Sequence, residues 1–126
     1  DGKPTAVLLT RGDRYAAELL EELRERTPGI QILCAGKLPS GTAEKLSLRD
    51  ALTPAERRGR GNAYARGGWW LHDRILTDTT LTVIRADVFA RRDLLDPRSG
   101  TPLPTYRRQR YTGGIGRYFP IFLYIK

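Results

Sequence analysis

The sequence predicts an α+β fold: a mainly antiparallel sheet of five or six strands, with two helices from the N-terminal half packed on one face. Two observations lead to this prediction. Helical periodicity is confined to about the first 60 residues, and β-branched and aromatic runs dominate afterwards. The length of 126 residues, with 40% hydrophobic and 29% charged side chains, suits a single domain with one core.

The first third of the chain has the pattern of a strand, a helix and a second strand. Short apolar runs at residues 5–10 and 30–35 indicate buried strands. Between them, Asp13 can cap a helix that runs to about Arg26, because its apolar side chains recur at spacings of three and four. A crossover of this length allows the two strands to pair in parallel.

The middle of the chain is predicted to contain a loop and a short second helix. Residues 36–45 hold two glycines and a proline, and they lack the GKS or GKT sequence of a phosphate-binding P-loop. Thr53, followed by proline and then by a glutamate at the third helical position, begins the helix. Gly59 and Gly61 are expected to end it within about two turns.

Two adjacent tryptophans characterise the next predicted strand. Residues 62–76 begin as a flexible loop and enter a strand near Trp69. Because neighbouring side chains on a strand face opposite ways, only one of Trp69 and Trp70 can enter the core. The other is expected to cover a groove or another element.

The last third predicts a long hairpin and a closing strand. Dense β-branched residues indicate one long strand at residues 79–92, a turn at 96–100 and a return strand at 103–111. Residues 118–125 form a final apolar strand, which Pro120 places at a sheet edge or at a bulge.

The net charge of +8 is distributed unevenly. Residues 1–55 balance eight basic against eight acidic side chains, whereas residues 56–117 hold thirteen arginines, no lysine and six acids. Guanidinium groups pair bidentately with phosphate and stack on bases, so this bias favours RNA or DNA as a partner. A GC-rich genome that encodes arginine in place of lysine would leave the same bias.

Two arginine-rich clusters, at residues 57–66 and 106–117, resemble each other, because each has arginines and tyrosine and then a glycine pair. If the long hairpin brings both to one end of the sheet, they form a basic groove with aromatic walls. Alternatively, the glycines only permit tight turns and the tyrosines fill a small core. The leading hypothesis is a nucleic-acid-binding domain, with RNA favoured. Its predicted contact residues are Arg57, Arg58, Arg60, Trp69, Tyr106, Arg107, Arg108, Arg110, Tyr111 and Arg117.

An alternative hypothesis is a small metal-independent ribonuclease, such as a toxin domain. Histidine is the side chain best suited to proton transfer near neutral pH, and His72 is the only one in the chain. Arg66 or Arg74 would stabilise the charged transition state, and Tyr64 would hold the nucleotide. Against this hypothesis, a lone histidine beside tryptophans is commonly an ordinary packing residue.

A third hypothesis is a pocket for an anionic small molecule, which the same arginines would suit. The sequence predicts neither a metal site nor a cofactor, because its motifs match no nucleotide, zinc or dinucleotide fingerprint. Several aspartates are available to a metal nuclease, yet they lack a recognised metal spacing: Asp73, Asp78, Asp87, Asp93 and Asp96.

The remaining predictions concern membrane association, localisation, protein partners and the single cysteine. No apolar run is long enough for a membrane span, and residues 1–9 lack a signal sequence, so no membrane partner is expected. A chain that begins at Asp1 and contains no methionine suggests a domain excised from a longer or processed protein, either cytoplasmic or exported within it. The positive charge also suits an acidic protein partner, for example an inhibitor. Cys34 is expected in the core.

Overall fold

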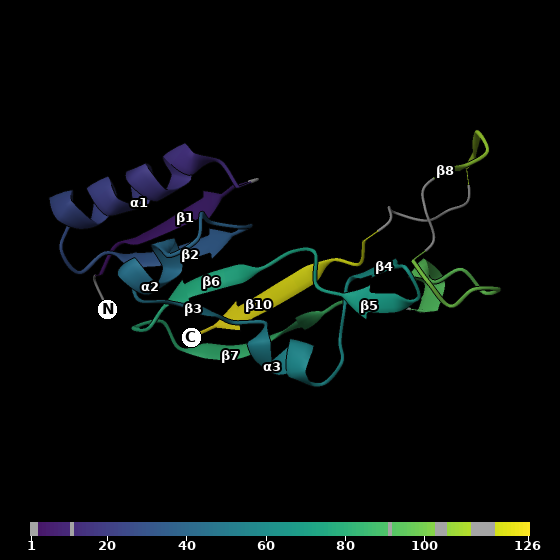
Figure 1. The fold of residues 1–126 in the computed structure, drawn as a ribbon. Coiled ribbons are helices and arrows are strands. Elements are labelled where there is room, and N and C mark those ends of the chain that lie inside the picture. The colour runs from purple at the N-terminus through teal and green to yellow at the C-terminus, as the bar shows by residue number, and fades with distance from the viewer. Residues whose placement is uncertain (1–2, 11, 91, 103–105, 112–117) are drawn as a thin grey trace. The chain divides into compact units, whose positions relative to one another are not determined.

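The computed structural model describes residues 3–10, 12–90, 92–102, 106–111 and 118–126 (Figure 1). By its internal contacts, the chain divides into two compact units. Unit 1 comprises Asp1–Leu52, Asp73–Arg85 and Leu123–Lys126, and unit 2 comprises Thr53–His72 and Ala86–Phe122. The single domain expected from the sequence stays a prediction.

Unit 1 is built on a four-stranded sheet. Its strands are β1 (Thr5–Leu9), β2 (Gln31–Ala35), β6 (Ile75–Asp78) and β3 (Leu48–Asp50), in that order. The parallel pairing of β1 with β2 agrees with the sequence prediction, since a helix connects them. β6 runs antiparallel to both of its neighbours.

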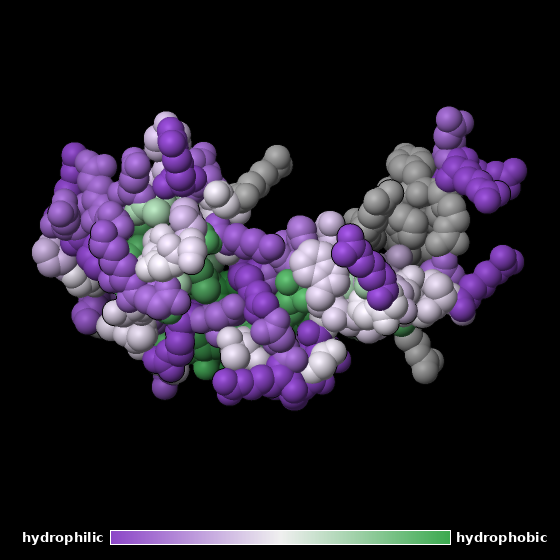
Figure 2. Space-filling model, viewed as in Figure 1, coloured by the Kyte–Doolittle hydropathy of each residue, from purple (hydrophilic) through white to green (hydrophobic). Residues whose placement is uncertain are grey.

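Helix α1 (Arg14–Arg26) covers one face of this sheet (Figure 1). The side chain of Asp13 caps the helix as predicted, accepting a hydrogen bond of 2.8 Å from the backbone N–H of Tyr15. The apolar stripe of the helix buries Leu20 against the sheet. The core that results contains Leu20, Ile30, Ile32 and Leu46. Hydrophilic side chains cover most of the visible surface, as Figure 2 shows.

Each of two segments in the middle of the chain contains a short helix: the predicted loop at residues 36–45 and the predicted second helix. One turn of helix, α2 (Thr42–Lys45), lies inside the predicted loop. Helix α3 (Thr53–Arg57), in unit 2, begins where the sequence predicted and ends before Gly59. Gly59 has a φ of +76°, a conformation that favours glycine and stops the helix.

Unit 2 contains a short hairpin where the sequence predicted a flexible loop. Strands β4 (Ala63–Ala65) and β5 (Gly68–Trp70) pair in antiparallel fashion. The two residues between them, Arg66 and Gly67, have φ values of +51° and +80°. Positive φ at both central residues is the pattern of a type I′ turn, which matches the twist of the flanking strands.

A second two-residue hairpin contradicts the predicted return strand at residues 103–111. β8 (Tyr106–Arg107) pairs with β9 (Arg110–Tyr111), so the chain reverses within the predicted strand. The turn residues Arg108 and Gln109 have φ values of +50° and +68°. Neither is a residue type that favours this conformation, and the sequence therefore held no turn signal.

The single long strand predicted at residues 79–92 is also wrong. A turn follows β6, in which the backbone N–H of Leu81 donates to the carbonyl of Asp78 at 3.0 Å. Within the predicted range, only β7 (Val83–Val88) is a strand among the described residues. The short 3-10 helix η1 (Arg92–Leu94) comes after it. β7 pairs with β10 (Ile121–Ile125), which begins directly after Pro120.

The fold class is therefore α+β with mostly antiparallel pairing, but the strands do not form one sheet of five or six. The described residues contain one four-stranded sheet and three two-stranded sheets, and three α-helices instead of two. The cause is the close spacing of turns, which divides the predicted long strands into pieces too short to extend a common ladder.

Candidate nucleic-acid interface

Nearly all of the net charge belongs to unit 2. Its residue ranges contain eleven arginines, no lysine and four acidic residues, whereas unit 1 contains eleven basic and ten acidic residues, including all four lysines. Unit 2 thus accounts for seven of the eight net positive charges. All of its cationic side chains are guanidinium groups, which can pair with phosphate in bidentate fashion.

A buried asparagine organises the centre of unit 2. Asn62 is fully buried, and its side-chain oxygen accepts from the backbone N–H of His72 at 2.8 Å. Its amide nitrogen donates to the carbonyl of Phe119 at 3.1 Å. The backbone of Asn62 also accepts from the N–H of Phe119 and donates to the carbonyl of Trp70. Asn62 therefore holds the end of β5 beside residues 118–119.

The first aromatic cluster lies on one face of the β4–β5 hairpin. The register pairs Tyr64 with Trp69, so both side chains stand on the same face. Their rings meet edge to face, with centroids 5.4 Å apart. On its other side, Trp69 stacks on Phe119 at 5.6 Å. Tyr64 and Trp69 nevertheless stay exposed, at 43% and 39%.

The second aromatic cluster forms around His72. Its ring stacks on Tyr118, with centroids 4.4 Å apart and planes within 4° of parallel, and meets Trp70 edge to face at 5.1 Å. His72 Nδ1 is buried and makes no hydrogen bond within the described residues. Trp70 is 41% exposed. Neither tryptophan enters the core, which corrects the prediction that one of them would.

Two of the predicted contact arginines have structural partners. Arg58 and Arg60 both pair with Asp87, at 3.5 and 3.2 Å, and Arg60 also donates to the carbonyl of Val88. Burial of Asp87 by itself raises the pKa of its carboxyl group. The Val88 N–H and the two arginines outweigh this effect and bring the pKa below its ordinary value. This cluster fixes α3 and its following loop beside β7.

Three other predicted contact arginines, and the predicted catalytic Arg66, lie on the surface of unit 2. Arg57 lies in α3, Arg66 and Arg108 occupy the tips of the two hairpins, and Arg110 lies in β9. All four are exposed. Of the remaining predicted contacts, Arg117 lies outside the described residues, as do the side chains of Tyr106, Arg107 and Tyr111.

The predicted catalytic residues have separate local contacts within their own units. Tyr64 contacts Trp69 on the hairpin face opposite Trp70, whereas Trp70 contacts His72. Arg74 belongs to unit 1, where its guanidinium group pairs with Asp50 at 3.1 Å. Among the described residues, the rings of Trp70 and Tyr118 contact the ring of His72.

The carboxylates have local structural roles. Asp87 binds two arginines, and Asp96 accepts from the backbone N–H of Arg98 at 2.8 Å within the turn predicted at residues 96–100. In the part of the chain that the structure describes, no group of three or more histidine, cysteine or acidic side chains could hold a metal ion.

Sequence reasoning missed Asn62, Tyr118 and Phe119, because these residues come together only through contacts between distant parts of the chain. Among the described residues, no helix has the length and apolar character needed to cross a membrane. Comparisons of this chain with known protein families, curated proteins and solved structures find no match.

Proposed function

We propose that unit 2 binds single-stranded nucleic acid, with RNA favoured. The observation that carries this proposal is a set of exposed aromatic rings in the unit that holds almost all of the net positive charge. The rings are held in place by one another and by Asn62, so they are ordered before any ligand arrives. Such preorganisation reduces the entropic cost of binding.

The aromatic rings favour unpaired bases over a duplex. Tyr64, Trp69, Trp70 and Tyr118 are 39–44% exposed while their other sides pack against neighbours. An exposed ring can stack on a base, a contact worth about 1–3 kcal/mol per base. Bases in a duplex already stack on one another, so this contribution is accessible only to single strands.

The exposed arginines supply contacts to phosphate. If Arg57, Arg66, Arg108 and Arg110 each neutralise one phosphate, log affinity falls with log salt at a slope of about −3 for a single strand. Arg58 and Arg60 contribute less to this slope, because Asp87 already compensates part of their charge. The salt dependence of the affinity therefore measures the contribution of the arginines. The difference in affinity between a single strand and a duplex measures the contribution of the aromatic rings.

Fluorescence titrations test the proposal directly, because Trp69 and Trp70 are the only tryptophans and both belong to the candidate site. We expect a short unstructured RNA to quench their emission and to bind more tightly than its duplex. Tyr64→Ala is expected to weaken this binding about tenfold. The control Tyr15→Ala removes an exposed ring from α1 in unit 1 and is expected to change nothing. Equal affinities for Tyr64→Ala and the unaltered protein would refute the proposal.

Incubation of the protein with RNA tests the ribonuclease hypothesis. Because Nδ1 of His72 is buried, any proton transfer to a substrate has to use Nε2. We expect RNA to remain intact after long incubation in EDTA. Products that end in a 2′,3′-cyclic phosphate, and that disappear with His72→Ala, would instead identify an enzyme. The matched DNA strand, titrated in parallel, tests the preference for RNA.

A further inference from the structure

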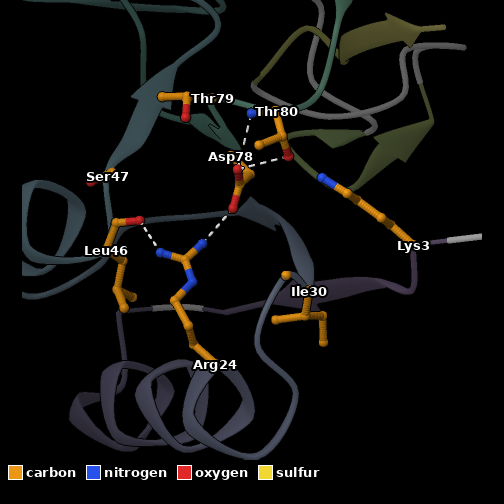
Figure 3. A pocket seen from close by; sticks show the side chains of 9 residues that line it. Lys3, Arg24, Ile30, Leu46, Ser47, Asp78, Thr79 and Thr80 are labelled. Atoms are coloured by element: carbon orange, nitrogen blue, oxygen red, sulfur yellow. Dashed lines mark hydrogen bonds and ion pairs between the residues drawn. The ribbon is translucent and has the colours of Figure 1, made fainter. Parts of the chain in front are cut away.

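Unit 1 contains a pocket that is separate from the arginines of unit 2. Its volume is about 220 Å³, and it lies between the C-terminal half of α1, the segment before β3 and the turn after β6 (Figure 3). Since one water molecule occupies about 30 Å³ in the liquid, a pocket of this size holds a small molecule of several heavy atoms. Its polar lining residues are Lys3, Arg24, Ser47, Asp78, Thr79 and Thr80.

Both oxygens of the pocket's single carboxylate, that of Asp78, already accept hydrogen bonds. One oxygen of Asp78 accepts from Arg24, and the other accepts from the backbone N–H and the hydroxyl group of Thr80, at 3.0 and 2.9 Å (Figure 3). Arg24 also donates to the carbonyl of Leu46. These bonds hold the guanidinium group at the pocket wall, and they leave Asp78 little capacity to accept from a ligand.

Several hydrogen-bond donors of the lining have no acceptor among the described residues. Within the described residues, the Lys3 ammonium group and the hydroxyl groups of Ser47 and Thr79 make no hydrogen bond or ion pair. Arg24 has five N–H donors, of which the two bonds above use two. Lys3, Arg24 and Asp78 together give the pocket a net positive charge.

One residue of the pocket lining, Ser47, has a strained backbone. Its φ is +56°, a left-handed conformation that is unfavourable for a residue with a β-carbon. Ser47 lies between α2 and β3 and belongs to the pocket lining. A glycine at this position would avoid the cost.

We propose that this pocket binds a small oxyanion, namely the phosphate or carboxylate group of a compact molecule. Lys3 and Arg24 supply charge, and the hydroxyl groups of Ser47 and Thr79 supply further donors. Ile30 and Leu46 line the remaining wall and offer an apolar surface to the rest of the ligand. This site is independent of nucleic-acid binding by unit 2.

Residue-resolved NMR titration with inorganic phosphate, at constant ionic strength maintained with chloride, tests this site. We expect saturable shifts of backbone amides at residues 46–48 and 78–80, within unit 1, and a parallel titration with acetate separates carboxylate from phosphate recognition. Lys3→Ala is expected to weaken binding about tenfold, as loss of one charge-assisted contact does.

Lys45→Ala is the matched control, because Lys45 also belongs to unit 1 but pairs with Glu21 at 3.0 Å outside the pocket lining. It is expected to leave the affinity for the anion unchanged. Thr79→Val gives a second variant that removes a donor but no charge. Shifts that increase without saturation for both anions, or an equal affinity in Lys3→Ala and Lys45→Ala, would overturn the proposal.

Discussion

In the turn of the β4–β5 hairpin, the substitution Arg66→Asn is expected to increase the stability of the fold and to weaken RNA binding. Arg66 and Gly67 both have positive φ, and the pair that favours such a turn most strongly is Asn-Gly. The backbone conformation of Arg66 is therefore unfavourable for an arginine. Because its side chain is exposed, packing does not compensate for this cost. Under our proposal its role is to contact a phosphate from the hairpin tip.

The magnitudes for Arg66→Asn follow from the geometry. A left-handed conformation costs an ordinary residue about 1 kcal/mol, and asparagine tolerates it better. We expect a gain of about 0.5–1 kcal/mol in the free energy of unfolding, which corresponds to about 2–4 °C in Tm. Loss of one phosphate contact is expected to reduce the salt slope by about 0.7, and hence to weaken binding about fivefold at about 0.1 M salt.

Thermal unfolding followed by circular dichroism measures the first effect, and RNA titrations at several salt concentrations measure the second. Arg66→Lys is the matched control, because it keeps both the positive charge and the strained backbone. It is expected to leave the melting temperature and the salt slope nearly unchanged. A lower melting temperature for Arg66→Asn, or an unchanged slope, would refute the reasoning.

Three further predictions concern stability, each measured by urea unfolding. The pKa of Asp87 is lowered in the fold, so its stabilisation is complete above the ordinary value of 3.8 and is lost as pH falls through the folded pKa. Asp87→Asn should therefore reduce the loss of stability at acidic pH. An unchanged dependence of the free energy of unfolding on pH would contradict this. Asn62→Ala leaves buried groups of His72 and Phe119 unpaired and should cost about 2–5 kcal/mol, whereas a loss below about 1 kcal/mol would contradict the proposed role. Leu20→Ala should cost about 2–5 kcal/mol, because Leu20 is fully buried in the core of unit 1; a neutral effect would show that this core is loosely packed.

The sequence alone was sufficient for elements whose stability is local. Helix α1 follows from the Asp13 cap and from an apolar stripe that recurs with the helical period. The helix between β1 and β2 is long enough to allow their parallel pairing, as the sequence indicated. The short α3 follows from the Thr-Pro-Ala-Glu sequence at its start and from the glycines after it. In each case, the residues that decide the structure are neighbours along the chain.

The tertiary structure decided where long β-rich segments turn. The turn after β6 depends on the carboxylate of Asp78, which accepts from Thr80 while it also binds Arg24 in α1. The turn at Arg108 and Gln109 uses residues that disfavour positive φ. Residue composition could not reveal either turn, and the sequence therefore predicted longer strands than the chain forms.

The composition of the candidate site was visible in the sequence, but its arrangement was not. Arginines and aromatic residues are countable, and they indicated a phosphate-binding partner. Asp87, 27 residues beyond Arg60, decides that Arg58 and Arg60 are engaged in ion pairs. The arrangement of the aromatic rings depends on Asn62 and Phe119, which are 57 residues apart. Conformational preference is determined mainly by adjacent residues, whereas burial and ion pairing are determined by whatever the folded chain brings into contact.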